Sequence, residues 1–280
     1  MSAHAGIGED SNYFFRILAM AGRSAAQLVR PPSHSRRAEA ARRLARHSLL
    51  ITTMLGLLII TLMYVLDARE IGLMPPRQSP NLWPVRILTA FGKDAYVLSA
   101  LAGLLILILL VSPLLRQSLR ARWLIFGMRV QFLFFAVLTP VLAGSVVKWI
   151  VGRGRPFVGG EANPFNFEPF AGTEAYASFP SGHAVTAFAL AVAVTAVWPR
   201  ARPVMIAYAF LIAASRLVLL AHHPSDVVAG ALVGVVGAMS VRYWFAARRL
   251  GFAIHRDGQI VPLRSISGGR KRVAHRPPAP

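Results

Sequence analysis

Long apolar stretches separated by short basic turns limit this chain's possible folds more than any other feature. Hydrophobic residues make up 55% of its 280 residues and charged residues only 15%, which is too apolar for a water-soluble chain of this length. A helix needs about 20 apolar residues to cross a membrane. Six runs approach that length: 48–66, 95–115, 123–147, 184–198, 203–221 and 227–245. We therefore predict an all-α polytopic membrane protein with six transmembrane helices, the fourth being the shortest.

These runs divide the chain into three parts. Residues 48–246 are expected to form one six-helix domain, between a basic N-terminal tail (1–47) and a basic C-terminal tail (247–280). Within the first tail, residues 13–29 fit either a short interfacial amphipathic helix or a disordered arm. Residues 69–88 contain four prolines and are expected to form an exterior loop, not a helix. The absence of cysteine excludes disulfides and thiolate metal sites.

The net charge of +20 raises the question of nucleic-acid binding, but the positions of the basic residues argue against it. Both tails and two short turns carry most of them, on one side of the six-helix arrangement. No aromatic platform or groove-reading motif accompanies them. The positive-inside rule therefore places both termini in the cytoplasm, with the basic tails against anionic lipid head groups. Residues 148–181 and the turn near His222 then lie on the exterior face.

A histidine and an aspartate four residues apart precede the last apolar run. His222 and Asp226 share a helix face if that helix begins near Pro224. A carboxylate that binds one imidazole nitrogen leaves the other free for nucleophilic attack. The alternative is a pair that only caps the helix. The spacing favours His222 over the adjacent His223, which is expected to face solvent.

The segment Pro180-Ser181-Gly182-His183 opens the fourth apolar run. Ser181 suits an N-cap position, and Gly182 would let a ligand approach the backbone. Free amides and the positive end of the helix dipole form an anion site, beside which His183 could serve as a general acid. The same residues also fit an ordinary helix cap with no ligand.

Three basic side chains could complete a phosphate site. Lys148 and Arg155 follow the third apolar run, and Arg216 lies inside the fifth. A buried membrane charge is costly and usually functional, and arginine binds phosphate oxygens in a bidentate manner. Snorkelling to the interface explains Lys148 but not Arg216. Arg153 fits either a fourth contact or an exposed loop charge, and the exposed loop charge is the favoured interpretation.

Together the three segments resemble the signature of the type 2 phosphatidic acid phosphatase (PAP2) family: Lys-x₆-Arg-Pro, Pro-Ser-Gly-His and Ser-Arg-x₅-His-x₃-Asp. All three match without substitution between residues 148 and 226. The resemblance implies a haloperoxidase-like helical core and a phosphatase that needs neither metal nor cofactor. It further implies that His222 attacks phosphorus, that Asp226 orients it and that His183 protonates the leaving group. The implied phosphate ligands are Lys148, Arg155, Ser181, Gly182 and Arg216. Vanadium-dependent haloperoxidases share this site, but they are soluble, so the apolar runs argue against that activity.

The loop between the first two segments contains three acidic residues, Glu161, Glu168 and Glu174, without the spacing of a magnesium or zinc site. Basic side chains are therefore expected to neutralise the phosphate. The loop also carries four phenylalanines between residues 157 and 170, which fit either a substrate entrance or a simple interfacial anchor.

These patterns predict hydrolysis of a lipid phosphate or diphosphate, through a phosphohistidine, at the exterior face of a bacterial-type inner membrane. Phosphatidic acid, phosphatidylglycerol phosphate, undecaprenyl diphosphate and lipid A all carry the group that the motifs would bind, so the motifs do not choose among them. One alternative is a lipid phosphotransferase that uses the same site. Another is a transporter with Arg216 and Asp226 in an ion path.

Overall fold

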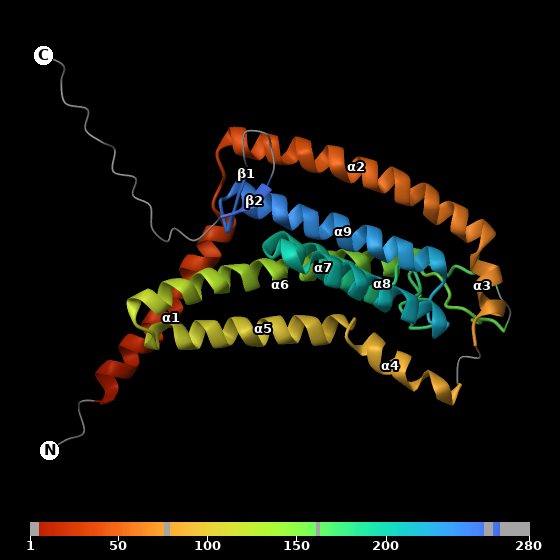
Figure 1. Cartoon of the computed structure of the whole chain (residues 1–280), viewed down its shortest axis with the longest axis horizontal. Coiled ribbons are helices and arrows are strands. Elements are labelled where there is room, and N and C mark those ends of the chain that lie inside the picture. The colour runs from red at the N-terminus through yellow and green to blue at the C-terminus, as the bar shows by residue number, and fades with distance from the viewer. Residues whose placement is uncertain (1–5, 76–78, 161–162, 255–259, 264–280) are drawn as a thin grey trace, which may run out of the picture.

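The chain folds into a bundle of helices with a short hairpin at one end (Figure 1). The computed structural model describes residues 6–75, 79–160, 163–254 and 260–263. The predicted all-α class is confirmed. Residues 264–280 of the C-terminal tail, and Glu161 of the acidic set, lie outside the described residues. The elements are α1 (Gly6–Val29), α2 (His34–Val65), α3 (Asp67–Leu73), η1 (Pro80–Leu82), α4 (Trp83–Ala90), α5 (Asp94–Val111), η2 (Ser112–Leu114), α6 (Gln117–Val151), α7 (Gly182–Val197), η3 (Pro199–Ala201), α8 (Arg202–Val218), α9 (Pro224–Ala247), β1 (Phe252–Ile254) and β2 (Ile260–Pro262).

Apolar helices occupy all six predicted positions, but only five of the helical segments in the described residues are both long enough and apolar enough to cross a membrane. These five are 34–65, 80–114, 117–151, 199–218 and 224–247. They make the chain an integral membrane protein. The remaining one, α7, has 16 residues, or about 24 Å at 1.5 Å per residue, against about 30 Å of hydrocarbon. The predicted count of six spans is therefore not confirmed.

The short helix α7 lies in the middle of the bundle and packs against α6, α8 and α9 (Figure 1). Close approach to α9 depends on two glycines of α9. A Cβ atom on Gly230 would lie 2.5 Å from the carbonyl oxygen of Ser181, and one on Gly234 would lie 2.5 Å from that of Val185. These contacts hold the first turn of α7 against the first turns of α9.

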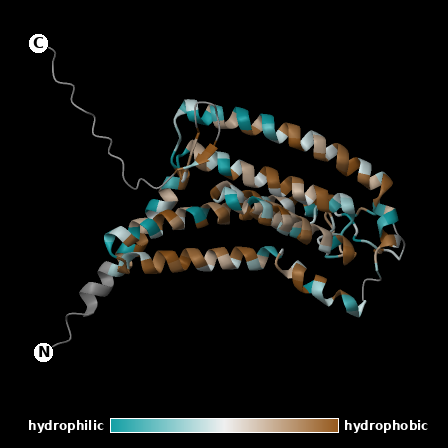
Figure 2. Cartoon of the chain, in the orientation of Figure 1, coloured by the Kyte–Doolittle hydropathy of each residue, from teal (hydrophilic) through white to brown (hydrophobic). Residues whose placement is uncertain are grey.

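Apolar side chains cover the outer surface of the bundle. Figure 2 shows hydrophobic residues along the middle of α2 and along α5, and hydrophilic residues near the ends of several helices. Leu57, Tyr64 and Ile106 are among the exposed large hydrophobic side chains of these two helices. An exposed apolar surface of this extent is expected to face lipid.

The segment between α2 and α5 differs from the prediction. Residues 69–88 were expected to form a loop, but much of the segment is helical, in α3, η1 and α4. The prolines do not prevent this, because Pro80 opens η1 and Pro84 lies in the first turn of α4, where a missing N–H costs little. At the N-terminus, α2 begins at His34, well before the predicted start at residue 48.

The chain after α9 forms an antiparallel hairpin in which Phe252 of β1 pairs with Pro262 of β2. Phe252 is buried, and its ring lies 4.7 Å from that of Phe132 in α6. Part of the predicted C-terminal tail is thus folded against the bundle.

Candidate active site

The three motif segments meet at the end of the bundle that is remote from the hairpin, near α3 in Figure 1. Lys148 lies in the last turn of α6 and Arg216 in the last turn of α8. Gly182 begins α7, and Asp226 lies in the first turn of α9. Helices α6 and α8 therefore end where α7 and α9 begin. The fold brings together residues that are up to 78 positions apart in the sequence, from 148 to 226.

His222 lies in the turn between α8 and α9 and is 2% exposed. Burial holds the pKa of His222 well below its ordinary value, and nearby charges lower it further in the order Arg216, Lys148, Arg155 and His183. The imidazole is therefore neutral at neutral pH. All three predicted basic phosphate ligands therefore lower the pKa of the same histidine, His222.

A backbone contact fixes the tautomer of His222. Its Nδ1 atom lies 2.8 Å from the carbonyl oxygen of Ser178. A carbonyl oxygen can only accept a hydrogen bond, so Nδ1 carries the proton. Nε2 is then the unprotonated nitrogen of the neutral ring, with its lone pair available.

Asp226 supports His222 indirectly, which corrects the predicted direct hydrogen bond. The distance from His222 Nδ1 to Asp226 Oδ2 is 3.9 Å. The Ser178 hydroxyl instead donates to Asp226 Oδ2 at 2.6 Å, and the His223 N–H donates to the same oxygen at 2.9 Å. Ser178 thus joins the carboxylate to the imidazole. His223, expected to face solvent, is fully buried because the start of α9 packs inside the bundle.

Arg153 is fully buried, so its predicted exposure was wrong. Its guanidinium donates to Asp226 Oδ1 at 2.6 Å, to Asp67 Oδ2 at 2.8 Å and to the carbonyl oxygen of Pro164 at 2.9 Å. Two carboxylates and a carbonyl compensate the cost of burying this cation. Arg153 thus binds Oδ1 of Asp226, whereas Ser178 binds Oδ2.

Asp67 extends this network to α3. It accepts hydrogen bonds from the N–H and from the hydroxyl of Ser225 in the first turn of α9. One turn further along α3, Glu70 is buried, and neither of its carboxyl oxygens has a hydrogen-bond partner among the described residues. Burial, followed by the charges of Asp67 and Asp226, raises the pKa of Glu70 to about 8. Glu70 is therefore mostly uncharged at pH 7.

The start of α7 presents unpaired polar atoms to the same region. Ser181 occupies the N-cap position, as predicted, but its side chain makes no capping hydrogen bond. Its buried hydroxyl and the buried Nε2 atom of His183 have no partner among the described residues. A Cβ atom on Gly182 would lie 3.7 Å from Lys148 Nζ. Free amides, a hydroxyl and an ammonium group therefore lie together, which suits a bound anion.

The other two predicted phosphate ligands are held by neighbouring residues. Arg216 donates from Nη1 to Thr89 Oγ1 at 2.9 Å, and Arg155 Nη2 lies 3.8 Å from the exposed carboxylate of Glu174. Sequence reasoning missed Thr89, which belongs to α4. Among the described residues, no group of three histidines, cysteines or acidic residues has the arrangement of a metal site.

Comparison with known proteins agrees with these motifs. Residues 129–250 match the family model described as the PAP2 superfamily. This region of the chain belongs to the PAP2 superfamily. The PAP2 region begins within α6 and ends just beyond α9. It contains every site residue predicted from the sequence. The predicted family is confirmed. Asp67, Glu70 and Thr89 lie outside it.

Two curated relatives are similar over about half of their length. Lipid A 1-phosphatase of Rhizobium johnstonii is 37% identical over 127 residues, which are 45% of this chain and 52% of the relative. Lipid A 1-phosphatase of Rhizobium etli is 35% identical over 127 residues, 45% of this chain and 55% of the relative. No solved structure matches the chain.

Proposed function

We propose that this chain hydrolyses a phosphate monoester of a membrane lipid and that the 1-phosphate of lipid A is its best candidate substrate. The observation that carries the activity is the neutral, buried His222, whose Nδ1 atom is held by a carbonyl oxygen and which lies within the field of three cations. The PAP2 match and the names of the two relatives support the reaction and the choice of lipid.

In the first step, Nε2 of His222 attacks phosphorus while the bond from phosphorus to the lipid oxygen breaks. Burial, followed by the charge of Arg216, lowers the pKa of His183 to about 3, so the proton comes from the substrate. His183 accepts the proton of the phosphate monoester monoanion and gives it to that oxygen, which leaves as the lipid alcohol. Lys148, Arg155 and Arg216 neutralise the phosphoryl oxygens, and the amides at the start of α7 donate to them. The Ser178 carbonyl accepts the Nδ1 proton throughout, so it stabilises the positive charge that develops on the ring.

In the second step, water attacks the phosphohistidine. The nitrogen–phosphorus bond breaks, His183 takes a proton from the water and passes it to the phosphate, and inorganic phosphate leaves. His222 returns to its neutral form, with Nδ1 still protonated. Basic side chains supply the charge compensation in both steps, so the proposal requires no divalent metal.

The proposed orientation places the site at the outer face of a bacterial inner membrane, with both termini in the cytoplasm. The distribution of basic residues supports this orientation. Exposed aromatic side chains lie at the end of the bundle that holds the site. The ring centres of Phe165 and Tyr64 are 5.2 Å apart, and those of Phe170 and Trp149 are 4.7 Å apart. Such residues favour the interface between head groups and acyl chains, where a lipid phosphate would enter.

The experiment is a phosphate-release assay on the purified chain in detergent, with a chelator and without an added acceptor alcohol. The substrates are lipid A carrying its 1-phosphate, phosphatidic acid, phosphatidylglycerol phosphate and undecaprenyl diphosphate. We expect the fastest release from lipid A. In His222→Ala we expect release to fall by at least about 10³-fold, because the nucleophile is gone.

His34→Ala is the matched control, because His34 is an exposed histidine at the start of α2, far from the site. It should keep full activity. Phosphate release that strictly requires a divalent metal, or that survives in His222→Ala, would contradict the proposed mechanism. Transfer to an alcohol without release of inorganic phosphate would identify a phosphotransferase instead.

A further inference from the structure

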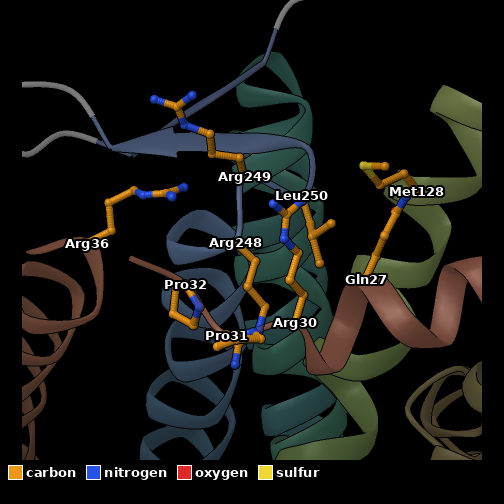
Figure 3. A pocket seen from close by; sticks show the side chains of 9 residues that line it. All are labelled: Gln27, Arg30, Pro31, Pro32, Arg36, Met128, Arg248, Arg249 and Leu250. Carbon is orange, nitrogen blue, oxygen red and sulfur yellow. The ribbon is translucent and has the colours of Figure 1, made fainter. Parts of the chain in front are cut away.

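A basic cavity lies at the other end of the bundle, far from His222. It encloses about 450 Å³ between the connection from α1 to α2, helix α6 and the residues that follow α9. Four arginines line it: Arg30 after α1, Arg36 in α2, and Arg248 and Arg249 after α9 (Figure 3). None of its nine lining residues is acidic. Four guanidinium groups around one space repel one another unless an anion lies between them.

Local contacts position two of these arginines. The guanidinium of Arg248 lies over the ring of Trp244, 3.4 Å from its centre, and the buried Nε atom of Arg248 has no hydrogen-bond partner among the described residues. Arg36 donates from Nε to the hydroxyl of Ser33 at 2.7 Å. Side chains that are already oriented lose less entropy when they bind a ligand. Their planar forks match the oxygens of a phosphate group.

An apolar groove adjoins the basic cavity. It encloses about 700 Å³ between α1, α5 and α6, and Gln27 and Met128 line both spaces. Most of its lining is apolar, including Leu28, Leu105 and Phe135. A charged compartment that continues into an apolar groove between membrane helices fits an amphiphile with an anionic head and acyl chains.

We propose that this composite site binds an anionic phospholipid from the leaflet at the hairpin end of the bundle. The head-group phosphate would lie among the four arginines, and an acyl chain would follow the groove past Leu105. Bound there, the lipid would join α1 to α5, α6 and the end of α9. The site is separate from the proposed phosphatase site and does not depend on it.

Native mass spectrometry of the purified full-length chain tests this proposal with phosphatidylglycerol, phosphatidylcholine of the same acyl chains, and inorganic phosphate as probes. The test variant is Arg30→Gln/Arg36→Gln/Arg249→Gln, which keeps Arg248 on Trp244. The control is Arg16→Gln/Arg42→Gln/Arg46→Gln, which removes the same charge from exposed arginines of α1 and α2 that do not line the cavity. We expect the test variant, but not the control, to bind phosphatidylglycerol at least about tenfold more weakly.

A second variant, Leu105→Trp, fills the groove and leaves the arginines in place. It should weaken binding of phosphatidylglycerol and leave binding of inorganic phosphate unchanged. Equal binding of the two phospholipids, or equal losses in the test and control variants, would overturn the proposal. Inorganic phosphate bound as tightly as phosphatidylglycerol would indicate a free-anion site and would also overturn it. Because the cavity is remote from His222, phosphate release in detergent should be unchanged in the test variant.

Discussion

At the scale of single residues, the site depends on how Asp226 reaches His222. The carboxylate is fully buried and accepts hydrogen bonds from Arg153, Ser178 and the His223 backbone. None of these comes from His222, whose Nδ1 proton goes to the Ser178 carbonyl. Ser178 therefore links Asp226 to the imidazole. Its charge still acts on the imidazolium that would form when phosphorus is attacked, across 3.9 Å.

Ser178→Ala tests this connection. The substitution keeps the backbone carbonyl that holds His222 but removes the hydroxyl that donates to Asp226 Oδ2 at 2.6 Å. We expect kcat for phosphate release to fall by about 10- to 100-fold, the usual effect of losing an indirect orienting contact, with KM nearly unchanged. The control is Ser240→Ala, whose hydroxyl donates only to the Val236 carbonyl within α9. Unchanged kcat in Ser178→Ala would show that Asp226 does not act through Ser178.

The pH dependence of the reaction tests the electrostatics of His222. Attack requires neutral imidazole, and burial and the Arg216 charge keep the pKa of His222 well below its ordinary value. The wild-type rate should therefore not fall on account of His222 until the pH is well below 6.5.

Arg216→Gln removes a positive charge, so the pKa of His222 should rise and the acid limb of kcat/KM should move to higher pH by about one unit. Arg202→Gln, at the opposite end of the same helix, should leave that limb in place. An acid limb at the same pH in the Arg216 variant and the wild type would contradict this electrostatic account.

At the scale of elements, the site exists because four helix ends coincide. Helix α7 is too short to cross a bilayer alone. Because it packs between α6, α8 and α9, protein and not lipid surrounds it, so it does not need to match the bilayer thickness. Small residues allow this packing: Gly230 and Gly234 of α9 face the backbone of α7, and a Cβ on Gly237 would lie 2.5 Å from Cβ of Pro140 in α6. The position of the α7 amides thus depends on the surface of α9.

Gly230→Ala should separate these two helices. The new Cβ would lie 2.5 Å from the Ser181 carbonyl oxygen, and a backbone atom cannot move aside as a flexible side chain can. We expect a loss of about 1–3 kcal/mol in the free energy of unfolding in detergent, together with reduced phosphate release. Gly103→Ala in α5, where nothing lies within 4 Å of a Cβ, should be neutral or slightly stabilising because alanine favours the helix. Equal thermal stability of the two variants would show that the contact of α7 with α9 is not tight.

The sequence predicted the helices and the meeting of the motifs better than it predicted the contacts around them. Apolar runs located the core of each helix, because lipid and the buried core both demand apolar residues over a long stretch. Partners far apart in the sequence carry no such local signal. Arg153 pairs with Asp67 and with Asp226, which lie 86 and 73 residues away. Ser178 likewise has no pattern that distinguishes it from an ordinary loop serine. For the same reason Arg153 was expected to be exposed.

At the scale of the whole molecule, two basic regions lie at opposite ends of the bundle. The proposed phosphatase site has three cations that act on one histidine, and the proposed lipid site has four arginines beside an apolar groove. Because the bundle crosses a membrane, the two ends lie at different leaflets. In the proposed orientation, which follows the positive-inside rule, the hairpin end faces the cytoplasm.

Cysteine labelling tests this orientation directly, because the chain has no cysteine of its own. Thr173→Cys places a thiol on an exposed residue of the loop before α7, and Ser118→Cys places one on an exposed residue at the start of α6, at the opposite end. In cells with a permeable outer membrane, an impermeant maleimide should label Thr173→Cys. Ser118→Cys should react only after the inner membrane is lysed. The reverse pattern would place the phosphatase site in the cytoplasm.

Detection of the covalent intermediate tests the central claim most directly. The purified chain is mixed with lipid A carrying a labelled 1-phosphate and quenched within milliseconds under alkaline conditions, and its peptides are then analysed by mass spectrometry. The account predicts a phosphoryl group on His222 that appears before inorganic phosphate, decays as phosphate is released, and is absent from His222→Asn. Phosphate release with no phosphorylated peptide, or with the phosphoryl group on another residue, would contradict it.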